Sequence, residues 1–378
     1  MPDLPHPRPL FLPDGRLDAA IARTADNAGP ADRGESDLAP DLDALQAAGL
    51  MAAPLPRRHG GAGLATSGEA TGRAVSVLRT VGRASLSVAR LYEGHVNAIR
   101  LVDLYGGEKV RRRTFEAVRA GSRLAVWGAD GDRPVTVEDE GGHLALSGAK
   151  RFASGLGLVD QAVVTARDGE GVRLVIVDVR DEARADPACW TASGMRATRS
   201  GTYTFDGVSV PREALLGAPG DVFREPFFEG GVWRYCAAHT GGAESLFCAM
   251  RQHLLERGRA EDPHQLARIA AAASACETAR LRVEAAAARV EAGPRESEAE
   301  REGAAACALL ARDATEAACL AVIDTAERAV GAAAFMEGEP IERIRRDLGL
   351  FLRQAAPDAK RARAARALLA GGGLAEDL

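Results

Sequence analysis

Cysteine is scarce in this chain, and its spacing suggests no pairing. The six cysteines, at positions 189, 236, 248, 276, 307 and 319, are scattered and include no Cys-x-x-Cys pair. This spacing supports neither a zinc site, which needs closely spaced ligands, nor a disulfide framework, which needs a high density of cysteine. We therefore expect reduced, mostly buried thiols in a cytoplasmic protein, and no bound metal.

Two further absences narrow the range of partners. The 48 Lys and Arg residues nearly balance the 53 Asp and Glu residues, and no basic stripe indicates nucleic-acid binding. No apolar run approaches the roughly 18 residues that a membrane-spanning helix needs. The first residues carry prolines and acids where a secretory signal would show a basic and then an apolar segment. We therefore expect neither nucleic acid nor a membrane among its partners.

A segment rich in strand-forming residues lies between two helical blocks. Residues 123–216 contain short runs of Val, Thr, Leu and Tyr separated by Gly-Gly and Asp-Gly turns, a pattern typical of antiparallel strands. The flanking sequence is rich in alanine and helical in its periodicity. The chain is thus predicted to divide into a loosely ordered arm (1–36), a helical domain (37–122), a β domain (123–217) and a helical bundle (218–378).

The helical blocks can be divided further. In the first half we expect a short helix at residues 17–25, a long one at 66–91 and another short one at 96–104. In the second half we expect helices at 232–257, 263–291, 297–330 and 340–370, which together make a four-helix bundle. Asp262-Pro263 and Ser297-x-x-Glu300 are typical helix starts, and the glycines at 371–373 should end the last helix.

Four short motifs relate the chain to a known family. They are Gly-x-Lys-x-Phe-x-Ser at residues 148–154, Gly-Met-Arg-x-Thr-x-Ser at 194–200, Phe-Asp-Gly-Val-x-Val-Pro at 205–211, and Arg346-Asp347. With these motifs in this order, the chain resembles the acyl-CoA dehydrogenase superfamily. It also shows some features of the two-component flavin monooxygenase branch of that superfamily. The resemblance implies a mainly α fold with a central, barrel-like β domain, a flavin between that domain and the bundle, and a homodimer or homotetramer.

The resemblance places the flavin contacts in two stretches of the β domain. One is a strand and turn whose backbone N–H groups face the pyrimidine edge of the flavin, which gains negative charge on reduction. The other is an aromatic-x-Thr/Ser position whose hydroxyl bonds the flavin near its reactive nitrogen. The matching residues here are Trp127, Gly128 and Ala129 in the first stretch, and Phe152, Ala153 and Ser154 in the second. The implied cofactor is FAD, with reduced FMN or FADH2 as a diffusible co-substrate in the alternative.

The chain departs from the dehydrogenases at the position of the catalytic base. Dehydrogenation of an acyl thioester needs a carboxylate held in an apolar pocket. In most of the superfamily this is a Glu about nine residues after the Arg-Asp pair, and the matching residue here is Ala355, which has no ionisable group. Asp358 and Glu229 are the nearest substitutes, although Asp358 also suits a structural role at a helix start.

His95 is a further catalytic candidate. An imidazole titrates near neutral pH, and related flavin monooxygenases use a His in a comparable place. The simpler alternative is a half-buried His that bonds to the backbone.

Three functions remain open on the sequence. The first is an FAD-dependent oxidoreductase that dehydrogenates the CH–CH group of an acyl thioester or a similar small molecule and passes electrons to a carrier protein. The second is a monooxygenase of the same fold, supplied by a flavin reductase, in which Ser154 and His95 stabilise a flavin hydroperoxide. Ser154-Gly155 and the missing Glu favour the second, whereas the absence of any histidine after His264 counts against it, and the first is the leading expectation. The third is a non-catalytic relative.

Overall fold

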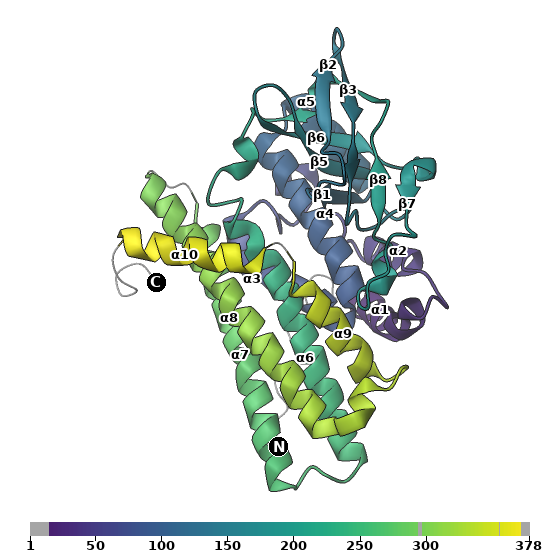
Figure 1. Cartoon of the computed structure of the whole chain (residues 1–378), viewed down its shortest axis with the longest axis vertical. Coiled ribbons are helices and arrows are strands. Elements are labelled where there is room, and N and C mark those ends of the chain that lie inside the picture. Colours follow the sequence, from purple (N-terminus) through teal and green to yellow (C-terminus); the bar gives the residue numbers. More distant parts are fainter. Residues whose placement is uncertain (1–14, 294–296, 355, 372–378) are drawn as a thin grey trace.

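Helices precede and follow a sheet region in this chain (Figure 1). The computed structural model describes residues 15–293, 297–354 and 356–371. The helices before the sheet are α1 (Arg16–Asp32), α2 (Ala39–Ala47), α3 (Thr71–Ala84), α4 (Leu86–Tyr105) and α5 (Glu108–Arg119). The prediction of a mainly helical fold around a central sheet is confirmed.

Two expectations for the N-terminal helices were wrong. Helix α1 has 17 residues rather than the nine expected, because Leu17, Ala20 and Ala31 on one of its faces are buried in the core. The break between α3 and α4 falls at Ser85, whose side chain accepts a hydrogen bond from Val88 N–H and so caps α4. Residues 90–95, where we expected the break, therefore lie inside a continuous helix.

The strands form two sheets in the segment where the sequence predicted them. The strands are β1 (Leu124–Trp127), β2 (Thr136–Asp139), β3 (His143–Ser147), β4 (Ala149–Lys150), β5 (Gln161–Arg167), β6 (Val172–Asp178), β7 (Ala185–Asp186), β8 (Thr202–Thr204), β9 (Val208–Pro211) and β10 (Leu215–Leu216). The larger sheet has the order β10-β6-β5-β2-β3-β9, with β1 pairing parallel to β5, and the smaller has the order β4-β8-β7. Inward-facing residues of both form one apolar cluster around Trp127 and Tyr203.

The second half of the chain is a helical bundle. It consists of α6 (Trp233–Glu256), α7 (Pro263–Val290), α8 (Glu298–Val330), α9 (Pro340–Phe351) and α10 (Pro357–Gly371). Helices α6, α7 and α8 pack on one another, α9 packs on α6, and α10 packs on α8. Glycines let α3 cross α6 closely: a Cβ at Gly241 would lie 2.0 Å from Arg79 O, and one at Gly82 would lie 2.3 Å from Ala238 O.

The cap signals of the bundle are present, but its last block differs from the prediction. Asp262 accepts from the backbone of His264 and Gln265, and Ser297 forms a capping box with Glu300. The expected helix 340–370 is two helices, because Pro357 cannot continue a helix from the residues before it. Ala355 and the glycines at 372–373 lie outside the described residues. Among the described residues no helix is long and apolar enough to cross a membrane.

Candidate flavin and substrate cavity

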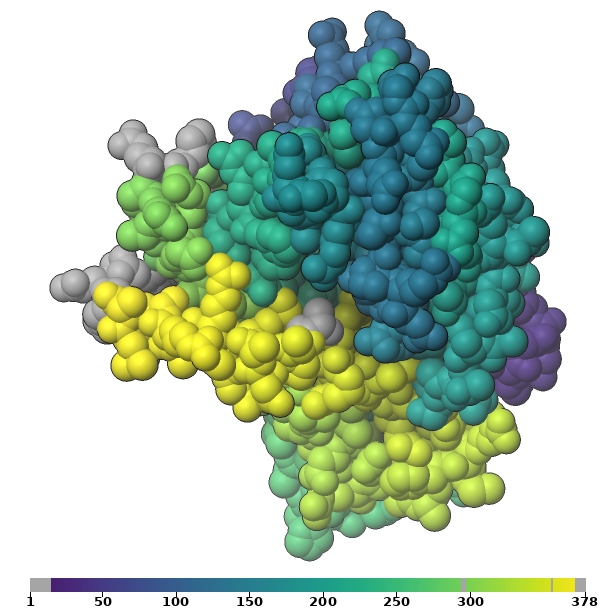
Figure 2. Space-filling model, turned by 45° about the horizontal axis from the view of Figure 1, so that its top comes forward, coloured from purple at the N-terminus to yellow at the C-terminus, as the bar shows by residue number. Residues whose placement is uncertain are grey.

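A cavity of about 890 Å³ lies where the sheet, α4, the start of α6 and the α9–α10 region meet. Its volume is within the range of small-molecule and cofactor sites, and its lining is mostly apolar, as such sites usually are. In Figure 2 the yellow C-terminal segment, which contributes Leu350 and Lys360 to the lining, borders the blue and teal surface of the sheet region. The cavity is therefore assembled from parts that are far apart in the chain.

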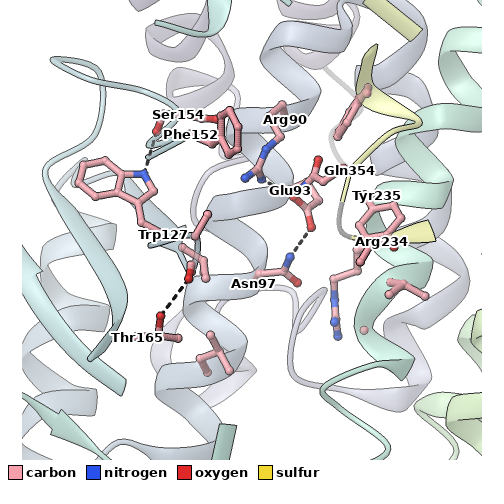
Figure 3. A pocket seen from close by; sticks show the side chains of 18 of the residues that line it. Arg90, Glu93, Asn97, Trp127, Phe152, Ser154, Thr165, Arg234, Tyr235 and Gln354 are labelled. Atoms are coloured by element: carbon pink, nitrogen blue, oxygen red, sulfur yellow. Dashed lines mark hydrogen bonds and ion pairs between the residues drawn. The ribbon is translucent and has the colours of Figure 1, made fainter. Parts of the chain in front are cut away.

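The sheet supplies one wall of the cavity (Figure 3). Trp127 ends β1, and its Nε1 donates a hydrogen bond to Ser154 O at 3.1 Å. Phe152 has a positive φ of 53°, an uncommon conformation for a residue with a side chain. Its ring is 55% exposed and meets the ring of Trp190 edge to face, with centroids 6.2 Å apart. An unusual backbone thus presents an aromatic ring and a hydroxyl to one cavity, which is typical of functional sites.

The Ser154 hydroxyl belongs to a short row of hydroxyl groups. Ser200 Oγ donates to Ser154 Oγ at 3.0 Å, and Thr198 Oγ1 lies 2.8 Å from Ser200 Oγ. Thr198 Oγ1 in turn donates to Met195 O at 2.8 Å. Because Ser154 accepts from Ser200, its own proton remains free to be donated to a ligand in the cavity.

The Arg-Asp pair of α9 holds the segment that carries these hydroxyls. Asp347 Oδ1 accepts from Met195 N–H at 2.6 Å, and Arg346 Nη1 donates to Ser193 O at 2.5 Å. The close approach of this segment to α9 depends on Gly194, because a Cβ at that position would lie 2.4 Å from Arg346 O. Burial raises the pKa of Asp347 to about 6, with the bond from Met195 acting in the opposite direction. The pair therefore positions the sheet wall.

Helix α4 supplies a polar wall. Arg90, Glu93 and Asn97 are spaced three and four residues apart, which puts them on one face of the helix, and all three point into the cavity. Arg90 Nη1 donates to Glu93 Oε2 at 2.8 Å, and Asn97 Nδ2 donates to Glu93 Oε1. Glu93 is only 2% exposed, so this pairing compensates for the burial of its charge.

A second ion-pair group lies where α4, α6 and α7 meet. Arg234 Nη2, at the start of α6, donates to Glu291 Oε1 at 2.7 Å. Glu291, which follows α7, also accepts from Arg100 Nη2 at 2.9 Å and from Trp233 Nε1 at 3.3 Å. Arg234 is 2% exposed and lines the cavity beside Tyr235 (Figure 3).

The structure brings together most of the residues predicted to contact a flavin. Trp127, Gly128, Ala129, Phe152 and Ser154 line the cavity. Ala153, between two of them, is fully buried in the sheet core. A hydroxyl that can donate, two aromatic rings and an apolar space of this size are groups that fit a flavin ring.

His95 lies outside the cavity lining, in the middle of α4 rather than at a helix start. Leu124 N–H donates to its Nδ1 at 3.0 Å, so Nε2 carries the proton and donates to Met51 O at 2.8 Å. The ring is fully buried, and this burial lowers its pKa to about 4. In this position His95 joins α4 to the first strand and to the segment after α2.

The predicted carboxylates are placed apart from one another. Glu229 lines the cavity, where it pairs with Lys360 and lies 3.7 Å from Arg363 Nη1. Asp358 is exposed in the first turn of α10 and does not line the cavity. Ala355, the position of the missing Glu, lies outside the described residues.

Sequence reasoning missed the polar groups on the helical walls: Arg90, Glu93, Asn97, Arg234 and Tyr235. The three on α4 did leave a signal, because polar residues recur on one face of a segment whose other residues are largely apolar. The expected helix break at residues 90–95 concealed that periodicity. Arg234 and Tyr235 left no such signal, since their function depends on which helix α6 packs against.

Fold and cavity together define a protein of the acyl-CoA dehydrogenase fold. No family model matches the chain. Among solved structures, methanesulfinate monooxygenase MsuC from Pseudomonas fluorescens has a TM-score of 0.82 at 24% identity and covers 96% of this chain and 98% of its own. TdsC from Paenibacillus sp. A11-2, solved with FMN and indole, has a TM-score of 0.81 at 22% identity. The match covers 94% of this chain and 98% of TdsC.

Curated relatives match at low identity. Dibenzothiophene monooxygenase of Mycolicibacterium goodii is 26% identical over 215 residues, which are 53% of this chain and 50% of the relative. The probable FMNH2-dependent monooxygenase SfnC of Pseudomonas putida is 26% identical over 306 residues, which are 76% of this chain and 75% of the relative. Glutaryl-CoA dehydrogenase of Desulfococcus multivorans is 24% identical over 214 residues, which are 53% of this chain and 54% of the relative. The predicted resemblance is thus confirmed, although the chain spans about half the length of the dibenzothiophene monooxygenases it matches.

Proposed function

We propose that this chain is a reduced-flavin-dependent monooxygenase of the acyl-CoA dehydrogenase fold. In such a reaction, one oxygen atom of O2 enters a small organic substrate and the other leaves as water, with two electrons from the reduced flavin. Most of the relatives named above are monooxygenases, and two are associated by name with FMN or FMNH2. This corresponds to the second function that the sequence left open.

The state of the carboxylates in the cavity carries this proposal. Of the described residues in the lining, Glu93 and Glu229 bear carboxylates, and each is held in an ion pair, with Arg90 and Lys360 respectively. The oxygens of Glu93 accept hydrogen bonds from Arg90 and Asn97, and those of Glu229 face Lys360 and Arg363, so neither carboxylate is free to take a proton from a substrate. Dehydrogenation of an acyl thioester needs a strong base at this place, whereas monooxygenation does not.

A reduced flavin bound here would supply the electrons that activate O2. Trp127 and Phe152 would form the aromatic side of its pocket, and the Ser154 hydroxyl would donate a hydrogen bond to the ring. Asn97, Leu101 and Leu104 of α4 would face the substrate on the opposite side. The largely apolar lining would exclude water from both.

Dehydrogenation is the second candidate, and one observation favours it. Glu93 is a buried carboxylate in the cavity, and a substrate that displaced Arg90 from it would leave a base in an apolar setting. Glu229, which the sequence singled out, would need to leave Lys360 in the same way.

Anaerobic and aerobic spectroscopy of the purified chain distinguishes the two candidates. We expect reduced FMN to bind more tightly than oxidised FMN, and bound reduced FMN to be oxidised by O2 at a rate different from that of free reduced FMN. Stoichiometric FAD that bleaches when acyl thioesters are added without O2 would replace the proposal with dehydrogenation. No binding of flavin in either redox state would leave only the non-catalytic relative.

The proposal extends to partners and assembly. A monooxygenase that takes up reduced flavin needs a flavin reductase, which we expect as a separate protein. We also propose a homodimer or homotetramer, because Leu266 and Leu281 on α7 and Leu320 on α8 are between 42% and 52% exposed, and apolar side chains on one bundle suit contact with another copy. Sedimentation of the purified chain tests this assembly.

A further inference from the structure

The helical wall of the cavity carries more positive than negative charge. Arg90 pairs there with Glu93, and Arg100 and Arg234 both pair with Glu291. Arg100 and Arg234 share the single carboxylate of Glu291, so three arginines are balanced by two glutamates. One positive charge is therefore left without a counter-charge at this wall.

That charge is buried. The side chains of Arg234 and Glu291 are 3% and 7% exposed, and that of Arg100 is 11% exposed. An arginine keeps its proton in a protein, and an uncompensated buried charge is costly. Burial lowers the pKa of Arg234, while Glu291 opposes that effect. An anion bound at this wall would compensate the charge.

Several polar atoms beside this charge lack a partner. Arg234 Nε, Arg100 Nε and Tyr235 Oη are buried and have no hydrogen-bond partner among the described residues. Tyr235 is 6% exposed and lines the cavity next to Arg234. Buried donors without acceptors are rare in folded proteins. Because protein atoms enclose these three groups, their side chains would have to turn toward the cavity before a ligand with oxygen acceptors could satisfy them.

The neighbouring charges do not supply the missing anion. Glu229 pairs with Lys360 and lies near Arg363, and Glu316 is shared by Arg353 and Arg312, so neither carboxylate is left over for Arg100 or Arg234. Glu93 is already bonded by Arg90 and Asn97, which argues against a cationic substrate at this wall. The surrounding lining is apolar and includes Leu101, Leu104, Leu174, Val222, Phe227 and Phe228.

We propose that the substrate is a small organic anion, with an oxyanion head such as a carboxylate or sulfinate and an apolar body. The head contacts Arg234 and Tyr235, and the body lies along the apolar lining toward Ser154. This inference rests on the proposed function, since it names the substrate class for the same cavity. The phosphate of FMN is another source of the same oxyanion chemistry, and the test below separates the two.

Equilibrium titration of the chain, with and without saturating FMN, tests the substrate class. The probes are benzenesulfinate and methyl phenyl sulfoxide, which are similar in size and differ in charge. We expect benzenesulfinate to bind at least tenfold more tightly. Equal binding of the two probes, or preference for the sulfoxide, would overturn the proposal.

Variants of α6 show whether Arg234 and Tyr235 make the contact. Arg234→Gln should abolish the preference for the anion, Arg234→Lys should retain part of it, and Arg251→Gln, at an exposed position of the same helix, should leave it unchanged. If circular dichroism shows that Arg234→Gln does not fold, Tyr235→Phe decides: it should weaken benzenesulfinate binding severalfold and leave sulfoxide binding unchanged. An unchanged affinity in the deciding variant would refute the contact.

Two flavins distinguish the sources of the oxyanion. If Arg234 held the flavin phosphate, Arg234→Gln would weaken FMN binding and spare riboflavin binding, and the substrate proposal would be overturned. We expect both flavins to bind the variant as they bind the wild type. Binding of benzenesulfinate by a chain that binds no flavin would support the anion site and refute the proposed monooxygenase function, so the two failures are distinguishable.

Discussion

The two walls of the cavity were assembled in different ways. In the sheet wall, Phe152 and Ser154 belong to one short motif; Ser154 accepts a hydrogen bond from Ser200, and Asp347 holds the backbone of Met195 in the segment that carries Ser200. The helical wall combines residues of α4, α6 and the end of α7, and its side chains are held by buried ion pairs. The comparison suggests that the cofactor side depends on backbone geometry, whereas the substrate side depends on charge balance.

Glu291→Gln should have the largest effect, because it removes charge from the helical wall alone. Arg100 and Arg234 would then be buried without a counter-charge, which costs about 3 kcal/mol or more. Urea unfolding near pH 7.5 should show this loss. The control Glu277→Gln removes the partner of Arg280 at a carboxylate that is 56% exposed, and should change stability by less than about 1 kcal/mol. Equal losses in the two variants would mean that burial of the ion pair does not matter.

Acid should lower the stability of the folded chain through two buried histidines, His95 between α4 and the sheet and His239 inside the bundle. Burial lowers the pKa of His95 to about 4 and that of His239 to about 3, while an unfolded histidine has a pKa near 6.5. Above pH 6.5 neither state is protonated, so the full stability is present there. As the pH falls toward 4 the unfolded chain takes up these protons and the folded chain does not, which costs roughly 1.4 kcal/mol per histidine for each pH unit.

Unfolding measured at pH 7.5 and at pH 5 checks this dependence. His95→Gln should reduce the drop in stability between the two pH values, because one of the two protons is no longer linked to unfolding. His143→Gln, at an exposed position on β3, should leave the drop unchanged. A His95→Gln protein with the pH dependence of the wild type would show that His95 is protonated in the folded state.

Ser154→Ala tests the sheet wall. It removes the hydroxyl that can donate to a flavin, which should weaken the binding of reduced FMN by about tenfold, or about 1.4 kcal/mol. Ser209→Ala, at an exposed position of β9, is the matched control. Fluorescence titration under anaerobic conditions measures both. Unchanged flavin affinity in Ser154→Ala would remove the hydroxyl from the proposed contacts.

The sequence was informative where a site depends on neighbours in the chain. Phe152 and Ser154 lie in one motif, and the cap at Ser297 is formed by residues three positions apart, so both could be predicted. His95 could not be placed, because the helix break depends on the Ser85 cap and on how α4 packs. Arg234 was missed for a related reason: its partner Glu291 is 57 residues away in the chain, and only the packing of α6 against α7 brings them together.

The smallest effect is expected from a carboxylate outside both walls. Asp358 was a candidate base on sequence grounds, but it is exposed at the start of α10. Asp358→Asn should therefore change stability by only about 0.3 kcal/mol, through its favourable position at the helix N-terminus, and should leave flavin binding and turnover unchanged. Glu229→Gln, which breaks a largely buried pair with Lys360 in the cavity lining, should cost more, about 2 kcal/mol. Loss of turnover in Asp358→Asn with an acyl thioester would instead restore the dehydrogenase function and would require α10 to move its first turn into the cavity.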